Sequence, residues 1–123
     1  MPLIEIHNLA PKMRNHGLLQ RALVKATLAA KVKHLTDAAK VHVVVGSRPI
    51  GFLTATKPPL FQFVYIHERD RTHEDFQRLA LFLSRAAYEV LSEHHGFVET
   101  VVGSVDKNGG HSRRFVCIYP SSK

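Results

Sequence analysis

A chain of 123 residues, 45% of them hydrophobic and 22% charged, has the size and composition of one compact globular domain, which excludes a disordered or collagen-like protein. Its formal net charge of +7 lies wholly in the first sixty residues, where nine Lys and Arg face two Asp and Glu; such a surface attracts polyanions or small anions without distinguishing them. No apolar run reaches the roughly 18 residues of a membrane span, no secretory signal follows Met1, and the single Cys117 allows no intrachain disulfide, so we expect a cytoplasmic protein without membrane contact.

The first half of the chain predicts a strand, a helix and a second strand. Leu3 to His7 is a strand candidate, and a turn region follows it. From Leu18 to about Leu35, apolar and small residues recur at spacings of three and four, which predicts an amphipathic helix with a basic outer side. Val41 to Val45 is a short β-branched run that is typical of a buried strand, and Gly46-Ser47-Arg48-Pro49 ends it.

The second half predicts the same order of elements, followed by a hairpin. Thr72-His73-Glu74-Asp75 has the form of a capping box with an aspartate at its last position, and the apolar stripe behind it predicts a helix that ends near Gly96. Strands are expected at Phe61–His67, at Val98–Val105 and, after a turn at residues 107–110, at Phe115–Tyr119.

Two short strings recur at similar places in these halves. Ile6-His7 returns as Ile66-His67 sixty residues later, and Val44-Val45-Gly46-Ser47 returns as Val101-Val102-Gly103-Ser104 fifty-seven residues later. We interpret residues 1–123 as one domain made of two β-α-β repeats, about 1–58 and 59–123, in which right-handed crossovers join parallel strands.

The predicted fold is therefore α/β (α+β), with one mainly parallel four-stranded sheet, short extra strands, and both helices on one face. The other face would be apolar and uncovered, so we expect the chain to self-associate. The residues assigned to that face are Val41, Val43, Val45, Phe61, Phe63 and Tyr65.

A proline at position 2, a half-length of about sixty residues and the doubled β-α-β pattern resemble the tautomerase superfamily, which includes 4-oxalocrotonate tautomerase and macrophage migration inhibitory factor. The most specific residues are Pro2-Leu3-Ile4-Glu5-Ile6-His7 and Arg69-Asp70-Arg71-Thr72. The second segment is similar to the paired-arginine segment of the malonate semialdehyde decarboxylase branch. The resemblance implies a homotrimer with a barrel of the tautomerase type and an active site centred on Pro2. It also implies that Arg69 and Arg71 contact a substrate carboxylate.

The chemistry of these residue types agrees with that implication. Removal of Met1 would leave the secondary amine of Pro2 at the end of a strand. An apolar site and neighbouring guanidinium groups both lower the pKa of an amine, which makes it a general base near neutral pH. Arg69 and Arg71, before a helix N-terminus, could hold a carboxylate and stabilise an enolate. We therefore predict an isomerase: a cofactor-independent tautomerase that transfers protons on a small 2-oxo or enol carboxylic acid.

Other residues and readings remain open. Arg14, in the matching turn of the first half, and His42, which corresponds to the second arginine of 4-oxalocrotonate tautomerase, complete the predicted substrate-binding set. With Pro2 as an ammonium, the same parts would decarboxylate a 3-oxo acid, or hydrate or dehalogenate a three-carbon acid. No metal site is expected, since the histidines lack ligand spacing. A third reading is a non-catalytic trimeric binding module, although the basic first helix lacks the aromatic residues that favour a nucleic-acid partner.

Overall fold

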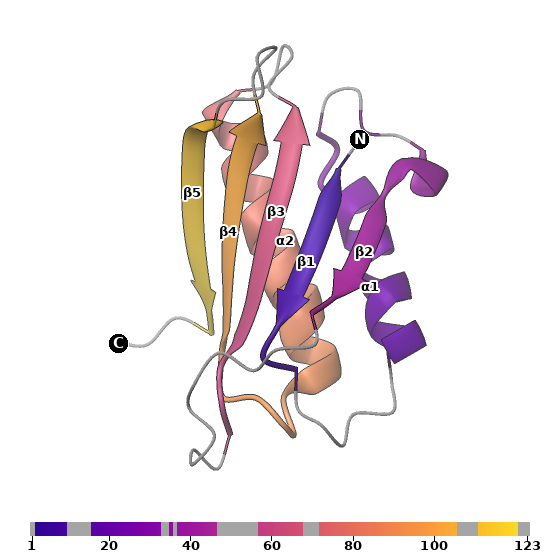
Figure 1. Cartoon of the computed structure of the whole chain (residues 1–123), viewed down its shortest axis with the longest axis vertical. Helices are drawn as coiled ribbons and strands as arrows, with labels where there is room; N and C mark the ends of the chain where they lie inside the picture. Colours follow the sequence, from indigo (N-terminus) through magenta and orange to yellow (C-terminus); the bar gives the residue numbers. More distant parts are fainter. Residues whose placement is uncertain are drawn as a thin grey trace.

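The computed structural model describes residues 2–9, 16–32, 35, 37–46, 57–67, 72–105 and 111–120. Figure 1 shows two helices against one face of a single sheet, whose other face is open. This arrangement, with five strands, confirms the predicted fold class. No helix of the described segments is long and apolar enough to cross a membrane. The elements are β1 (Leu3–His7), α1 (His16–Ala29), the short 3-10 helix η1 (Ala38–Lys40), β2 (His42–Val45), β3 (Leu60–His67), α2 (His73–Leu91), β4 (Val98–Val105) and β5 (His111–Tyr119).

The sheet consists of two parallel pairs that run in opposite directions. The strand order is β2-β1-β3-β4-β5, with β1 parallel to β2 and β3 parallel to β4, while β1 pairs with β3, and β4 with β5, in antiparallel fashion. β1 and β2 therefore begin where β3 and β4 end. We name this the Pro2 end of the sheet, and the opposite end, where β3 and β4 begin, the Leu60 end. In Figure 1, α1 runs from the Leu60 end to the Pro2 end, and α2 runs the other way.

The strand register relates the two halves by an approximate twofold axis and corrects one of the two sequence matches. Ile6 pairs with Val45 in the first half, whereas Val102, the sequence match of Val45, pairs with Val64 in the second half. Ile6 therefore corresponds to Val64, and the Ile66-His67 string lies two residues too far along. The prediction that both matches fall at equivalent places was wrong for this pair, because β3 is three residues longer than β1.

The glycine shared by the other match has a steric cause. A Cβ atom at Gly46 would lie 2.7 Å from His7 Nδ1 and 3.2 Å from the carbonyl oxygen of Ile6. His7 therefore packs on a position that only glycine can occupy without displacement. In the second half, Gly103 lies opposite Tyr65, which corresponds to His7 under the twofold relation.

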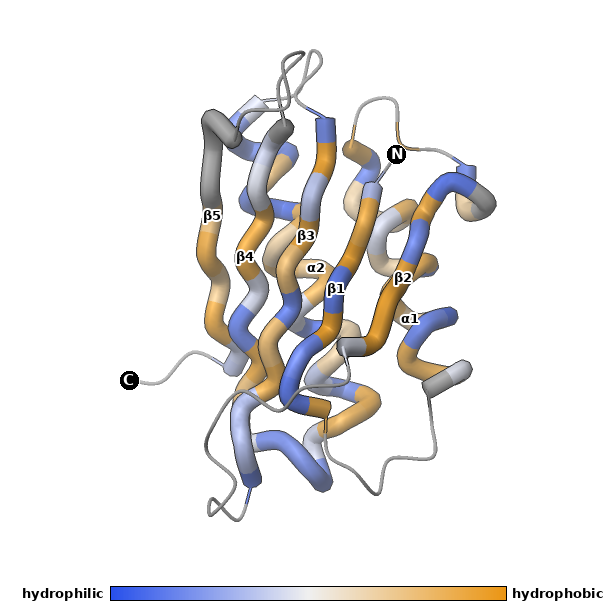
Figure 2. The backbone as a smooth tube through the Cα atoms, in the orientation of Figure 1, coloured by the Kyte–Doolittle hydropathy of each residue, from blue (hydrophilic) through white to orange (hydrophobic). Residues whose placement is uncertain are grey.

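Alternation along the strands divides the sheet into a core face and an open face. Ile4 and Ile6 are buried under the helices, and Val43 and Val45 pack against the same core. Apolar residues of this core line the strands and both helices in Figure 2. Phe61, Phe63 and Tyr65 alternate with the buried residues of β3 and thus lie on the open face, as predicted. The assignment of Val41, Val43 and Val45 to that face was wrong, since a run of valines carries no polar residue that would mark which side faces solvent.

A local capping box marks the start of α2, and a residue with positive φ follows the end of α1. Thr72 caps α2: the amide of Asp75 donates to Thr72 Oγ1 (3.3 Å), and the amide of Thr72 donates to Asp75 Oδ2 (3.0 Å), which confirms the predicted capping box. α1 ends at Ala29, six residues before the predicted end at Leu35. The left-handed backbone of Lys31 (φ 53°) accompanies this early end.

Candidate active site

Pro2 is buried immediately before β1, near the middle of the sheet. Its carbonyl oxygen accepts a hydrogen bond of 3.0 Å from the amide of His42, at the start of β2. The parallel register places Leu3 opposite His42, and alternation puts Pro2 on the core side together with Ile4. The peptide group between Pro2 and Leu3 is thus fixed in the sheet by this hydrogen bond. The nitrogen of Pro2 lies on the side away from β1, at the end of the sheet.

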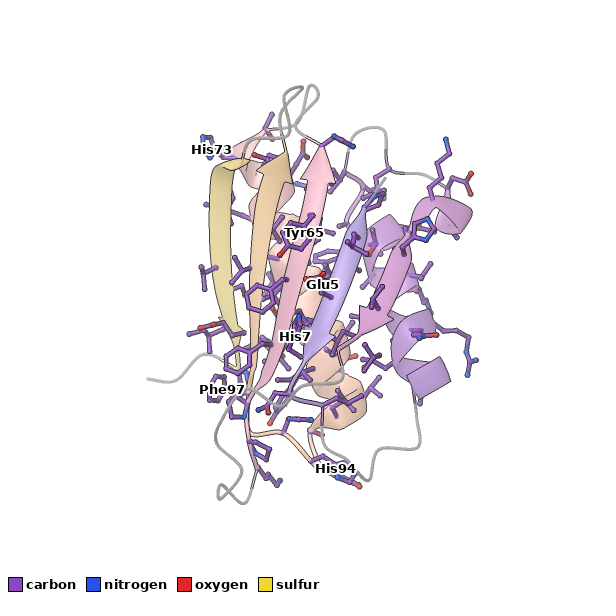
Figure 3. The ribbon with its side chains drawn as sticks, in the orientation of Figure 1. Glu5, His7, Tyr65, His73, His94 and Phe97 are labelled. Atoms are coloured by element: carbon purple, nitrogen blue, oxygen red, sulfur yellow. The ribbon has the colours of Figure 1, made fainter. Side chains whose placement is uncertain are left out.

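The last residues of β3 are the second boundary of this site. Because β1 and β3 are antiparallel, Leu3 lies opposite Tyr65. Pro2 is therefore beside Ile66 and His67, the last two residues of β3. Ile66 is buried and His67 is exposed. On the open face, the strand pairing places three side chains in one row across β2, β1 and β3, next to the position of Pro2 in the sheet. They are those of His42, Leu3 and Tyr65. Figure 3 shows Tyr65 with Glu5 and His7 on this face.

Arg69 and Arg71 fall outside the described residues. The described neighbours of their segment are His67, which ends β3, and Thr72, which caps α2. Both lie at the Pro2 end of the sheet (Figure 1). The first residue of α2 is placed over β5, since the rings of His73 and Phe115 make an edge-to-face contact with centroids 5.2 Å apart.

The positive end of α2 is already partly neutralised. Asp75 lies in the first turn, where the hydrogen bond from the Thr72 backbone, together with Arg78, holds the pKa of its carboxyl below the usual value. A charged carboxylate at a helix N-terminus interacts favourably with the helix dipole. An anion bound at this end would therefore depend on arginine side chains more than on the dipole of α2.

The two remaining predicted site residues are His42 and Arg14. His42 is described: it is exposed at the edge strand, and its backbone contacts Pro2. Arg14 lies outside the described residues, two positions before α1, which begins at the Leu60 end (Figure 1). Glu99, the counterpart of His42 under the twofold relation, also lies towards the Leu60 end, opposite Phe61. The described part of the chain thus brings Pro2 and His42 together and separates them from Glu99.

Tyr65 and His67 are candidates that the sequence reading did not identify. Their nearness to Pro2 follows from the antiparallel pairing of β1 and β3, whereas the reading expected a mainly parallel sheet. The doubled pattern in the sequence was the signal that could have indicated this pairing. When two repeats are related by a twofold axis, their first strands, here β1 and β3, lie antiparallel to each other.

Among the residues that the structure describes, no three His, Cys, Asp or Glu side chains lie close enough together to bind a metal ion. His95 is buried at the Leu60 end, and its Nδ1 is 2.8 Å from the carbonyl oxygen of Pro58. Cys117 is half-buried, with its side chain packed against the core.

No family model matches the sequence, and no curated protein is similar to it. Solved structures share its fold. A wild-type fused 4-OT, in an asymmetric trimer, aligns with a TM-score of 0.66 and 17% identity over 88% of this chain and 89% of that chain. A member of the cis-3-chloroacrylic acid dehalogenase family aligns with a TM-score of 0.64 and 14% identity, over 90% of this chain and 83% of that chain. A 5-carboxymethyl-2-hydroxymuconate delta-isomerase aligns with a TM-score of 0.56 and 14% identity, over 94% of this chain and 88% of that chain. These neighbours are enzymes of the tautomerase superfamily, and at such identities the likeness shows that this chain has their fold.

Proposed function

We propose that this chain is a cofactor-independent tautomerase that transfers protons on a small 2-oxo or enol carboxylic acid, with the amine of Pro2 as acid and base. One observation carries the proposal: Pro2 is buried at the start of a central strand, beside the end of β3 that leads into Arg69 and Arg71. The enzymes that share the fold support an isomerase-type activity.

The reaction requires an amine that can lose and regain a proton. Removal of Met1 would free the Pro2 nitrogen, in a setting where desolvation disfavours the ammonium. With an enol acid, the nitrogen accepts the proton of the 2-hydroxyl group, and the electrons of that O–H bond form the π bond of the carbonyl. The π electrons of the enol C=C bond then form the new C–H bond with a proton that the ammonium returns. Arg69 and Arg71 would hold the carboxylate and stabilise the negative charge that develops on oxygen.

The chain between His67 and Thr72 limits where those arginines can be. Five residue steps span at most about 17 Å when fully extended, and both anchors lie at the Pro2 end. In the sequence, Arg69 follows the end of β3 by two residues, and Arg71 directly precedes Thr72, the cap of α2. We therefore assign carboxylate binding to both and the closer approach to Arg69. The paired arginines also favour the malonate semialdehyde decarboxylase branch of the superfamily.

Arg14 and His42 take different places in this proposal. His42 borders the site of its own chain. Arg14 precedes a helix that begins at the Leu60 end, and β1 alone separates the two ends by about 17 Å, five residues at roughly 3.3 Å each. Arg14 would therefore reach Pro2 only from a second copy of the chain.

The open face supports self-association as a homotrimer. Val44, Val116 and Ile118 on this face are 51%, 58% and 46% exposed, and Phe61, Phe63 and Leu3 lie among them. These apolar side chains share the face with Glu5 and Glu99, which pair with Val44 and Ile118, and exposed apolar clusters of this kind favour a protein partner. Fused 4-OT chains of the same fold form trimers. A trimer would bury this face and bring a second chain to each Pro2 end.

The test is ketonisation of phenylenolpyruvate or 2-hydroxymuconate, followed by ultraviolet absorbance, with protein whose intact mass shows the loss of Met1. Pro2→Ala and Arg71→Ala should each reduce kcat/KM by on the order of 10²- to 10⁴-fold. Arg85→Ala, an exposed position on α2, is the control and should leave it unchanged. Unchanged activity in both site variants would overturn the proposal.

A second candidate activity is hydration or dehalogenation of a three-carbon acid, with Pro2 as a cationic acid. It is favoured by the structural likeness to the cis-3-chloroacrylic acid dehalogenase family. Product analysis with propiolate, 3-chloroacrylate and malonate semialdehyde separates hydration, dehalogenation and decarboxylation from tautomerisation. Retention of Met1 in native protein, with salt-sensitive binding of heparin or RNA, would instead favour a non-catalytic module.

A further inference from the structure

Arg78 of α2 closes the end of α1. Its Nε donates a hydrogen bond to the carbonyl oxygen of Ala30, and its Nη2 donates another, of 3.3 Å, to that of Lys31. Carbonyl groups at a helix C-terminus lack partners within the helix and carry partial negative charge, which a cation stabilises. A single side chain of the second half therefore binds the last turn of the helix in the first half.

Asp75 connects this contact to the cap of α2. Its Oδ1 accepts a hydrogen bond of 2.7 Å from Arg78 Nη2, while its Oδ2 accepts from the amide of Thr72. The two carboxylate oxygens thus join two different partners. Because both partners favour the charged form, the pKa of Asp75 lies below its usual value, with the Thr72 backbone as the main cause. The carboxylate is therefore fully ionised near neutral pH, and the network is complete there.

The two ends of this network lead to the two parts of the candidate site. Thr72 directly follows Arg71, so Asp75 holds the point at which the paired-arginine segment joins α2. Beyond Lys31 the chain leads through η1 to His42, whose amide binds the carbonyl oxygen of Pro2. Within the described residues, the side chains of Asp75 and Arg78 link the helix that follows the arginines to the half that carries Pro2.

We propose that Asp75 and Arg78 are positioning residues that hold the start of α2, which directly follows the paired-arginine segment in the sequence, against the half of the chain that carries Pro2. This inference rests on the proposed function, and neither residue is assigned a contact with substrate. The side chain of Arg78 is 37% exposed and that of Asp75 14% exposed, so the pair contributes modestly to stability. Its larger effect is geometric, since displacement of a binding group by about 1 Å can reduce turnover by roughly 100-fold.

The experiment compares Asp75→Asn and Arg78→Met with Arg85→Met in enzyme freed of Met1. Arg85 is a matched control because it lies on the same helix and contacts the Phe82 ring, with its guanidinium carbon 5.6 Å from the ring centroid. We expect KM for the enol acid to rise by about tenfold in both test variants, with a smaller change in kcat and an unchanged pH profile, because the amine of Pro2 is untouched. Arg78→Lys should restore little, since an ammonium cannot serve carbonyl and carboxylate acceptors in the fork geometry of a guanidinium.

Two measurements separate the possible failures. Circular dichroism and thermal unfolding show which variants are folded. If Arg78→Met does not fold, Asp75→Asn, which keeps the shape of the side chain, carries the test. Binding of phenylpyruvate is followed by NMR at the amides of Thr72 and Phe76. Wild-type protein that neither binds this probe nor turns over enol acids overturns the proposed function and this inference with it. Wild-type activity together with folded variants that keep the wild-type KM overturns the inference alone.

Discussion

His95 makes the stability of the fold depend on pH. Its side chain is fully buried, and Nδ1 lies 2.8 Å from the carbonyl oxygen of Pro58, the residue that leads into β3. Burial is the main cause that lowers the pKa of His95 from its ordinary 6.5, and the nearby charge of His94 adds to it. The carbonyl groups of Pro58 and Pro59 favour the cation and offset part of the effect. The neutral ring therefore belongs to the folded state.

The sign of the pH dependence follows from proton counts. Below about pH 6.5 the unfolded chain binds a proton at His95 that the folded chain does not bind, so the free energy of unfolding falls as pH falls. The stabilisation is complete above pH 6.5 and is lost progressively as the pH approaches the lower pKa of the folded state. One proton limits the slope to about 1.4 kcal/mol per pH unit. Lys57, whose Nζ donates to the carbonyl oxygen of Ser92 at 3.2 Å, is a further cation near this turn.

Urea unfolding between pH 7.5 and 4.5 measures this term. His95→Asn places an amide donor near the position of Nδ1 and removes the ionisation, so its free energy of unfolding should fall less steeply with acid than that of the wild type. His94→Asn, at the adjacent half-buried position, removes a charge that lowers the pKa of His95, so its slope should lie between those of the wild type and of His95→Asn. Parallel pH profiles for the wild type and His95→Asn would refute the reasoning, because the carboxylates that also titrate are common to both proteins.

Three further substitutions address packing and assembly. Gly46→Ala should cost about 1–3 kcal/mol, because the new Cβ meets the ring of His7 and a fixed carbonyl oxygen; Gly17→Ala in α1, where the nearest atom is a flexible Arg21 nitrogen at 3.4 Å, should instead be neutral or stabilise by up to about 1 kcal/mol in the same denaturant titration. Gln62→Leu should lower the free energy of unfolding by about 1–3 kcal/mol, because Gln62 Nε2 donates buried hydrogen bonds to the carbonyl oxygen of Leu83 (3.2 Å) and to Thr100 Oγ1 (2.9 Å), and removal of the unpaired Oε1 offsets only part of that loss; an unchanged free energy of unfolding would contradict this. Val116→Asp, on the open face, should shift the mass measured by light scattering from trimer towards monomer, and an unchanged mass would place the interface elsewhere.

The elements were predictable because their signals are local. The capping box at Thr72 and the apolar stripe behind it identify α2 without any knowledge of its neighbours. The end of α1 was not predictable in the same way, because its closing contact comes from Arg78, almost fifty residues later. The facing of the valine run in β2 depends likewise on which side of the sheet the helices cover. Periodicity within one element carries no information about such contacts, so the errors concern relations between elements.

The candidate site follows the same division. Pro2 could be identified from its place in the sequence, and the parallel pairing of β1 with β2 brings His42 beside it. The place of α1, which follows Arg14 in the sequence, depends instead on the direction of this helix relative to the sheet. A match between repeats suggested that the arginines of both turns serve one site. In the fold, β1 ends at the Leu60 end and β3 ends at the Pro2 end, so the described elements that flank the two turns lie at opposite ends of the sheet.

The twofold relation also explains why only one end can carry the proposed chemistry. The register makes Leu60 the counterpart of Pro2, with the amide of Leu60 bound to the carbonyl oxygen of Phe97 at 3.0 Å. A chain-internal amide cannot act as an amine base. The residues before Leu60 are instead fastened from two sides, by Asn8 Nδ2 on the Pro59 carbonyl oxygen (2.8 Å) and by the buried His95 on that of Pro58. Equivalent backbone positions thus support a buried structural contact at the Leu60 end and, once Met1 is removed, the terminal amine that we propose at the Pro2 end, and this difference predicts that changes at His95 alter unfolding while changes at Pro2 alter turnover.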